Sequence, residues 1–259
     1  MKPLFNPVTV SVNAKINIGL QVIRKRPDGY HDLQTVFYPT DFFTDTLTVS
    51  PYEGDFSFQV ASAEDIGDSS DNLCVKAFQL LQRDYGISGV AISLQKGIPT
   101  GAGLGGGSAD AAFTLKVLKD IFQLPVSEQN MARYALLLGS DVPFFLYNQP
   151  VYATGRGEVL TPIDLNLSSY RLKIVKPDIH VSTKEAYAGI SPKASDIFLP
   201  EVLLRDAKDW EGLVTNDFEK PVFAKYPELW EIKRELYRDG AVYASMSGSG
   251  SAVFGLFSD

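Results

Sequence analysis

The chain has 259 residues, of which 45% are hydrophobic and 21% charged, the ordinary composition of a folded globular protein rather than a disordered one. Its formal net charge is −7 and no block of Lys and Arg occurs, which argues against a nucleic-acid partner. No apolar run is long enough to span a bilayer, and the first residues lack the apolar core of a secretion signal. We therefore expect a cytoplasmic protein without a membrane partner.

Cysteine and histidine are too rare to build a metal or disulfide framework. Cys74 is the single cysteine, which excludes an intramolecular disulfide and a thiolate cluster. The two histidines, His31 and His180, have no metal-ligand spacing around them, so a zinc site is not expected. Cys74 could be a nucleophile, but a free cysteine at this point of a helix is more often a small buried residue.

The first part of the chain has the pattern of strands. Even positions of residues 8–22 are mostly apolar, which predicts a half-buried strand or two strands joined near Asn13. Lys15 and Asn17 have the opposite parity and should lie on the other face. Residues 26–29 form a turn by their chemistry, and strands are expected at 33–37 and 46–50, before a looser stretch at 51–70.

Helices are expected next. Asp71 can cap a helix that runs to Tyr85, and a short strand follows at 90–94. A second helix should begin at about Ser108, and Ser127 can cap a third that ends at Gly139.

After residue 162 the pattern restarts. It predicts a strand at 170–175, helical stretches at 201–218 and 228–239, and a final strand at 252–257. Because helices and strands occur in blocks, we expect an α+β fold with two lobes, residues 1–162 and residues 163–259.

Residues 101–108 form a glycine-rich segment directly before an amphipathic helix. Five of its eight residues are glycines, so the backbone can approach a phosphate closely and turn its N–H groups toward it. The helix that follows adds unsatisfied N–H donors and the positive end of its dipole. Ser108 could add a hydroxyl to a phosphate or to a bound Mg²⁺.

Three other interpretations of this segment are weaker. Gly101, Gly103 and Gly106 satisfy the dinucleotide fingerprint, but residues 96–100 separate them from their strand, and no strand with an acidic end follows. The Walker pattern fails because no Gly-Lys-Ser/Thr follows. A flexible linker would seldom lead at once into an amphipathic helix, so phosphate binding is favoured.

Several short segments can be compared with known motifs. They are Ala14-Lys15-Ile16-Asn17, Arg26-Pro27-Asp28-Gly29-Tyr30-His31, Asp71-Asn72-Leu73, residues 99–112, Leu138-Gly139-Ser140-Asp141-Val142-Pro143-Phe144, Gly155-Arg156-Gly157-Glu158, Val181-Ser182-Thr183 and Ser247-Gly248-Ser249-Gly250-Ser251. In these segments, and in their order over nearly the whole chain, the protein resembles the GHMP small-molecule kinases.

The resemblance implies a two-lobed fold, with an N-terminal ribosomal-protein-S5-domain-2-like lobe that binds ATP and a C-terminal ferredoxin-like lobe. It also implies a kinase that uses ATP and Mg²⁺ to phosphorylate an alcohol. Asp141 resembles the base that takes the hydroxyl proton, and Lys15 resembles its electrostatic partner. The segments around Lys15 and Tyr30 are similar to those of members that phosphorylate the C2 hydroxyl of 4-diphosphocytidyl-2-C-methyl-D-erythritol.

The same resemblance implies the other site residues. Tyr30 and Tyr187 match the aromatics that sandwich the cytosine ring, His31 matches the residue that hydrogen-bonds it, and Asn17 and Thr183 match positions near the substrate. Those matching the ATP site are Asn72 and Lys96 at the adenine end, and Pro99, Gly101, Gly103, Leu104, Gly105, Gly106, Gly107 and Ser108 at the phosphates. The Mg²⁺ ligands stay unassigned, and we expect Asp110 to be structural at the first turn of its helix.

Alternatives remain open at this point. By residue type alone, Lys15 and Asp141 could be solvated surface charges, and Tyr30 and Tyr187 could be packing aromatics. A sister kinase of the homoserine or mevalonate type, or a catalytically silent nucleotide-binding module, would share the loop. A monomer or weak homodimer is expected.

Overall fold

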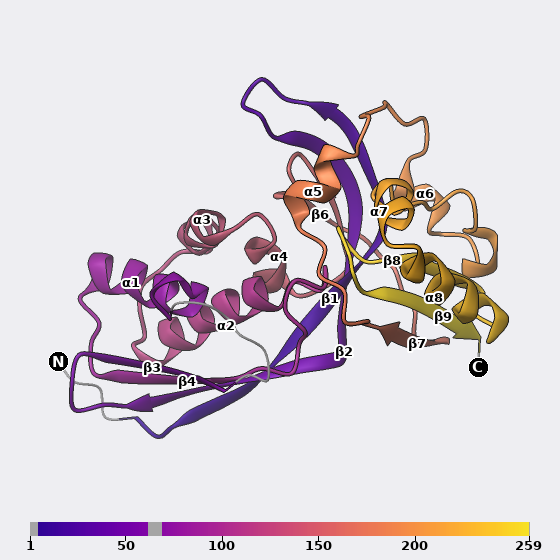
Figure 1. Cartoon of the computed structure of the whole chain (residues 1–259). Coiled ribbons are helices and arrows are strands. Elements are labelled where there is room, and N and C mark those ends of the chain that lie inside the picture. The colour runs from indigo at the N-terminus through magenta and orange to yellow at the C-terminus, as the bar shows by residue number, and fades with distance from the viewer. Residues whose placement is uncertain (1–4, 62–68, 259) are drawn as a thin grey trace. The chain divides into compact units, whose positions relative to one another are not determined.

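The computed structural model describes residues 5–61 and 69–258, drawn in colour in Figure 1. The chain forms two compact units, each assembled from several segments. The first contains Met1–Ala14, Phe43–Thr100 and Gly105–Asn148, and the second contains Lys15–Phe42, Gly101–Leu104 and Gln149–Asp259. The predicted boundary near residue 162 stays a prediction.

Helices cover a small sheet in the first unit. The C-terminal part of β2 (His31–Pro51) pairs antiparallel with β4 (Val90–Gln95), and β4 pairs parallel with β3 (Phe56–Ala61). The described residues of this unit form the helices α1 (Leu73–Tyr85), α2 (Gly106–Ile121), α3 (Glu128–Leu138) and α4 (Val142–Tyr147). Helix α2 packs against the other three, so the segment that follows the glycines lies in the middle of the helical layer (Figure 1).

The second unit contains two sets of strands. The N-terminal part of β2 pairs with β5 (Val151–Thr154), which pairs with β6 (Val159–Pro162). A separate antiparallel sheet has the order β7-β9-β8, formed by Tyr170–Val175, Val253–Ser258 and Tyr243–Met246.

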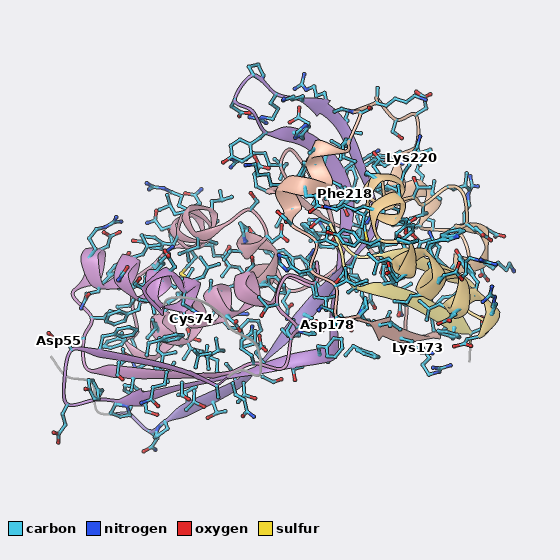
Figure 2. The ribbon with its side chains drawn as sticks, in the orientation of Figure 1. Asp55, Cys74, Lys173, Asp178, Phe218 and Lys220 are labelled. Carbon is cyan, nitrogen blue, oxygen red and sulfur yellow. The ribbon has the colours of Figure 1, made fainter. Side chains whose placement is uncertain are left out.

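Helix α8 (Pro227–Arg238) packs on this sheet and against α7 (Glu219–Lys225). The core of the second unit includes Phe218, labelled in Figure 2, together with Leu229 and Met246. Its remaining helical segments are α5 (Thr183–Ala188), α6 (Leu199–Val202) and the 3₁₀ turn η2 (Ala207–Asp209); a similar turn, η1 (Ser69–Asp71), precedes α1.

The strands are longer than the sequence pattern predicts. The expected strand at 8–22 is one continuous strand, β1 (Val8–Lys25), without a break at Asn13. The strands expected at 33–37 and 46–50 are both parts of β2. From 12 to 22 every residue of β1 is buried, so its polar face is covered as well as its apolar face. Strand β3 was missed in the stretch expected to be loose, of which residues 62–68 lie outside the described part.

The helices differ from expectation mainly at their ends. Asn72 rather than Asp71 caps α1, because its side-chain oxygen accepts a hydrogen bond from the backbone N–H of Cys74. Helix α2 begins at Gly106, two residues before Ser108. The predicted cap at Ser127 and end at Gly139 are confirmed for α3.

Residues 201–218 do not form the expected helix. Trp210, Val214 and Phe218 are buried at intervals of four, which imitates the helical period. Their backbone instead passes through η2 and turns. The helix expected at 228–239 and the strands expected at 170–175 and 252–257 are confirmed within a residue or two. Within the described residues, the structure has no helix of the length and hydropathy needed to cross a membrane.

Candidate active site

Lys15 is buried on β1 and is held by the first part of the glycine-rich segment. Only 3% of the residue is exposed, and its ammonium donates to the Gly103 carbonyl oxygen at 3.1 Å and to the Asn17 side-chain oxygen. Its backbone N–H donates to the Leu104 carbonyl at 3.0 Å. The ring of Phe37 lies beneath the ammonium, 5.0 Å from centroid to Nζ. Lys15 is therefore not a solvated surface charge.

The second glycine-rich segment, residues 247–251, contacts the same carbonyl. The Ser247 hydroxyl donates to the Gly103 carbonyl oxygen at 2.8 Å and accepts from the Asn17 backbone N–H at 3.1 Å. Asn216 supports the turn by donating to the carbonyls of Met246 and Gly248, each at 2.8 Å. The second unit thus gathers three of the sequence motifs around one carbonyl oxygen.

Gly103 and Gly107 are glycines for different reasons. Gly103 has φ +74°, and a Cβ there would lie 2.0 Å from the Ser247 carbonyl oxygen. That contact explains its glycine by packing, independently of any phosphate. A Cβ on Gly107 would meet nothing closer than Leu73, at 4.0 Å. Gly107 is therefore a position where close approach of a ligand, rather than protein packing, would require glycine.

The start of α2 has the properties expected of an anion site. Gly105, at its N-cap, has φ +76°, and no side chain caps the helix. The first N–H groups of this 16-residue helix therefore lack a capping oxygen. Gly106, Gly107 and Ser108 supply these donors, and the helix dipole adds a positive potential at the same end.

The two residues expected at the adenine end of ATP make contacts with the protein itself. Asn72 caps α1 through its side-chain oxygen, at 2.9 Å from the Cys74 backbone nitrogen. Lys96 donates to Asp110 at 2.7 Å and also to Asp45. Burial alone would lower the pKa of Lys96, but the two carboxylates outweigh it and the pKa is raised, so the side chain is an ammonium. Their adenine contacts stay predictions.

Two other buried groups in the first unit have strongly displaced pKa values. Burial raises the pKa of Asp110 to about 7 although Lys96 opposes this. Burial likewise raises the pKa of the Cys74 thiol to about 12, which leaves it protonated and unreactive near neutrality. The expectation that Cys74 is a buried helix residue is confirmed (Figure 2).

Asp141 occupies the N-cap position of α4. It is partly buried, and four apolar residues, 142–145, follow it into the core. Helix α4 packs against α2, the helix that begins at the glycines. Asp141 belongs to the first unit and Lys15 to the second, so their pairing stays a prediction.

The residues expected to bind a cytosine ring lie in the second unit. The rings of His31 and Tyr187 stack at 4.8 Å with an angle of 19°, and Phe218 meets the edge of Tyr187 at 4.8 Å. Tyr30 is 55% exposed, and the Arg156 guanidinium lies over its ring at 4.7 Å. Tyr187 is thus packed against Phe218 of the core, whereas Tyr30 lies at the surface with the Arg156 guanidinium over its ring.

Sequence reasoning assigned no role to three residues that support these side chains. Thr35 accepts from the Asn17 amide at 3.0 Å, Asn216 fixes the turn at 247, and Arg156 contacts Tyr30. Arg156 stands in a quoted motif, which was a usable signal, but Thr35 and Asn216 have no local pattern. Thr183, expected near the substrate, lies 3.2 Å from Ser249 through their hydroxyls.

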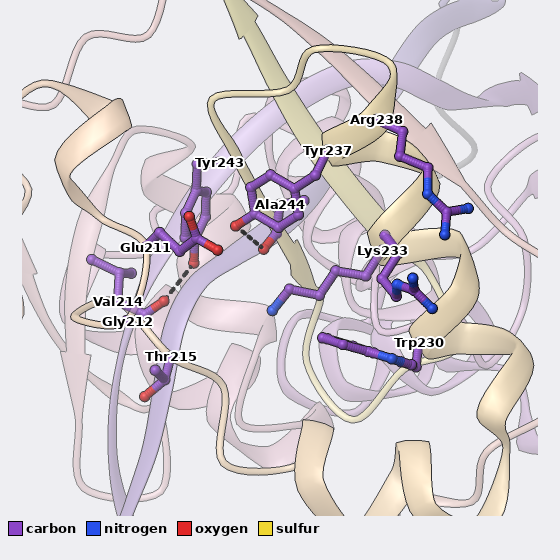
Figure 3. A pocket seen from close by; sticks show the side chains of 11 residues that line it. Glu211, Gly212, Val214, Thr215, Trp230, Lys233, Tyr237, Arg238, Tyr243 and Ala244 are labelled. Carbon is purple, nitrogen blue, oxygen red and sulfur yellow. Dashed lines mark hydrogen bonds between the residues drawn. The ribbon is translucent and has the colours of Figure 1, made fainter.

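A pocket of about 580 Å³ in the second unit contains none of the predicted site residues. It is lined by α8 and by residues near 211–215, as Figure 3 shows. Lys233 pairs with Glu219 at 2.7 Å, and Arg234 pairs with Glu231 at 3.0 Å, so two of its cations are already compensated.

Comparison with known proteins identifies the class. Family models match the GHMP kinases N terminal domain at residues 72–149 and the GHMP kinases C terminal domain at residues 198–259. The chain belongs to the GHMP kinases, and the predicted α+β fold is confirmed.

Individual relatives are more specific. The chain is 50% identical to a 4-diphosphocytidyl-2-C-methyl-D-erythritol kinase of Bacteroides thetaiotaomicron and 48% identical to one of Bacteroides fragilis; each match covers 95% of this chain and 90% of the relative. A crystal structure of 4-(cytidine 5'-diphospho)-2C-methyl-D-erythritol kinase is similar with a TM-score of 0.82 and 35% identity, over 96% of this chain and 90% of that one. Homoserine kinase from Cytophaga hutchinsonii, at 15% identity, TM-score 0.71 and coverage of 100% and 87%, shares the fold.

Proposed function

We propose that this kinase transfers the γ-phosphoryl group of ATP to the C2 hydroxyl of 4-diphosphocytidyl-2-C-methyl-D-erythritol, a step of non-mevalonate isoprenoid biosynthesis. The observation that carries phosphoryl transfer is the buried ammonium of Lys15, fixed by Asn17 and the Gly103 carbonyl of the glycine-rich segment. The choice of acceptor is supported by the near-full-length likeness to kinases named for it, at 46–50% identity.

The chemistry needs a proton acceptor and stabilisation of charge. In the proposed step the substrate oxygen forms a bond to the γ-phosphorus, the bond from that phosphorus to the bridging oxygen of ADP breaks, and the hydroxyl proton passes to the Asp141 carboxylate. The Lys15 ammonium stabilises negative charge on the phosphoryl oxygens in a buried setting, where such an interaction is stronger than in water. The N–H groups that begin α2 hold the phosphates.

Mg²⁺ fits this site as an ion bound largely by the nucleotide. The described residues include no cluster of three His, Cys, Asp or Glu side chains that could hold a metal by themselves. Mg²⁺ in kinases commonly keeps several waters and is held by substrate phosphates with few protein groups. Ser108, at the start of α2, is the hydroxyl that would reach a phosphate or its ion, and the ion would neutralise phosphate charge.

Recognition of the cytidine half is assigned to the second unit. Tyr30 and Tyr187 offer flat faces for stacking, and His31 offers ring nitrogens for hydrogen bonds to the base. In the structure His31 stacks on Tyr187, so we propose that the cytosine ring inserts beside or in place of this contact. Asn17 and Thr183 are proposed to lie near the remainder of the substrate.

A phosphorylation assay tests the proposal. The protein with ATP and Mg²⁺ should phosphorylate 4-diphosphocytidyl-2-C-methyl-D-erythritol and leave homoserine and mevalonate unchanged. Turnover of one of those two acceptors instead would move the assignment to a sister kinase. ATP binding without consumption by the wild type and by Asp141→Asn would indicate a silent module. The cytoplasmic location and the monomeric or weakly dimeric state remain predictions.

A further inference from the structure

Three charged side chains of the first unit form a buried cluster at the base of the glycine-rich segment. Asp45 comes from β2, Lys96 follows β4, and Asp110 lies in the second turn of α2. The Lys96 ammonium donates to both carboxylates, at 2.7 Å for Asp110. Their side chains are 0%, 10% and 4% exposed in the order Asp45, Lys96, Asp110. Two of the three ammonium donors are therefore committed inside the protein.

The cluster links the residues before the glycine-rich segment with those after it. The second oxygen of Asp45 accepts from the backbone N–H groups of Gly97 at 2.6 Å and Ile98 at 2.8 Å. Asp110 lies after the segment, and Lys96 links it to Asp45 by donating to both carboxylates. Both ends of residues 97–109 are thus fixed to one carboxylate of β2, so the first turn of α2 has a defined position relative to Ile98.

The Lys96 ammonium lies close to Gly106, the first residue of α2. A Cβ on Gly106 would lie 2.9 Å from the Ile98 side chain and 3.3 Å from the Lys96 ammonium. Lys96 and Ile98 therefore border the backbone at Gly106, where the free N–H groups of α2 begin. These are the groups expected to receive phosphate.

As a source of folding stability alone, this buried charge cluster would be unfavourable. Two carboxylates share one ammonium, and one oxygen of Asp110 is buried without a hydrogen-bond partner in the described structure. An unpaired buried oxygen costs free energy, and well-packed apolar residues are often at least as stable as a buried ion pair. Features that break these rules are expected where function requires them.

We propose that Asp45, Lys96 and Asp110 are positioning residues that hold the start of α2 in the arrangement required for nucleotide phosphates, and that Lys96 acts through this backbone rather than on adenine. The inference rests on the proposed phosphate binding by the glycine-rich segment. It replaces the adenine contact expected for Lys96 with an indirect role.

Binding measurements with three probes separate the two roles. Calorimetry would give the dissociation constants of ATP, inorganic tripolyphosphate and adenosine for the wild type, Lys96→Met, Asp110→Asn and Lys96→Arg. A positioning role predicts that Lys96→Met weakens ATP and tripolyphosphate by a similar factor, about tenfold, and leaves adenosine unchanged. Lys96→Arg should recover part of the loss because it retains charge and donors.

Each other result contradicts the proposal in a recognisable way. Weaker adenosine and ATP binding with normal tripolyphosphate binding would place Lys96 on adenine. Unchanged binding of all probes would make the cluster purely structural. Asp110→Asn keeps the Lys96–Asp45 pair and the side-chain shape, so it is expected to be more stable than Lys96→Met and serves as the second variant if Lys96→Met fails to fold. It should weaken tripolyphosphate binding and leave adenosine binding unchanged. Lys173→Met, which breaks an exposed pair with Asp239, is the control and should change nothing.

Wild-type protein that binds neither ATP nor tripolyphosphate would contradict the proposed function itself, and the cluster's role with it. That outcome is distinguishable from failure of the cluster proposal alone, in which the wild type binds both probes.

Discussion

Lys15 and Lys96 are both buried lysines beside the glycine-rich segment, but their surroundings differ. Lys15, in the second unit, donates to neutral oxygens of Asn17 and Gly103. Lys96, in the first unit, donates to two carboxylates. The Gly103 and Asn17 oxygens orient the Lys15 ammonium at the glycine-rich segment, whereas two carboxylates of the first unit hold the Lys96 ammonium. The comparison supports the proposals that Lys15 acts on the reacting phosphoryl group and that Lys96 positions the loop.

The largest expected effect is on the proton acceptor. Asp141→Asn should lower kcat by about 10²–10⁴, because the amide cannot accept the hydroxyl proton, while ATP affinity stays near that of the wild type. Steady-state kinetics and ATP titration measure this. The exposed Asp55→Asn is the control, and wild-type turnover in Asp141→Asn would exclude its role as base.

Stability should separate the two lysines. Lys96→Met leaves two buried carboxylates without their cation and should cost about 3–5 kcal/mol of unfolding free energy. Lys15→Met removes the donor to the Asn17 side-chain oxygen, while the Gly103 carbonyl keeps its hydrogen bond from Ser247, and should cost about 1–3 kcal/mol. Urea unfolding measures both. Adding Asp110→Asn to Lys96→Met should recover part of the loss, and a double variant less stable than the single one would contradict the assigned charges.

Gly103 and Gly107 offer a matched test within the loop. Gly103→Ala places a Cβ against the Ser247 carbonyl at a positive φ and should destabilise the fold by about 1–3 kcal/mol. A Cβ in Gly107→Ala would meet only Leu73, at an ordinary contact distance of 4.0 Å, so this variant should fold normally, yet it should weaken ATP binding if phosphate approaches there. Equal stability of the two variants would contradict the packing role of Gly103.

A smaller effect is expected at the substrate face. Arg156→Gln removes the cation from the Tyr30 ring, a contact worth about 0.5–1 kcal/mol at an exposed site. The KM for the cytidine substrate should rise about two- to fivefold with kcat little changed. Arg171 lies over Phe257 at the same 4.7 Å, so Arg171→Gln is a matched control that should leave KM unaltered. Equal kinetic effects in both variants would remove Arg156 from the site.

The charge cluster also predicts a pH dependence of stability. Burial raises the pKa of Asp110 to about 7, whereas the pKa of an aspartate in an unfolded chain is about 4. The folded state therefore holds a proton that the unfolded chain releases, so this group's contribution to stability decreases as pH rises from about 4 to about 7. Asp110→Asn should lessen that slope in urea midpoints, with Lys96 remaining charged throughout. An unchanged slope would show that Asp110 is already ionised when buried.

Local chemistry predicted the elements that depend on neighbouring residues. The caps of α3, the strand at 170–175 and the helix at 228–239 follow from period and end signals over a short window. The sequence pattern did not predict that β1 is buried on both faces or that β2 is one continuous strand, because both features depend on tertiary contacts. Trp210 and Val214 imitated a helical period because they pack into the core from turns.

The contacts around the candidate site could be predicted only in part, because many of them join distant parts of the sequence. The sequence motifs pointed to Lys15 and the glycines, but the hydrogen bond from Ser247 to Gly103 joins residues 144 positions apart. Sequence spacing does not reveal such a contact. The ion pairs of Lys96 with Asp45 and Asp110 likewise come from separate elements, so its contacts inside the protein were not expected.

The most direct test of the division between the two lysines is to measure kcat and the ATP dissociation constant for Lys15→Met and Lys96→Met side by side. Lys15→Met should lose about 10²–10³ in kcat with ATP affinity within a few-fold of the wild type. Lys96→Met should mainly lose ATP affinity, by about tenfold. Normal turnover in Lys15→Met, or the same parameter changed equally in both variants, would contradict the account.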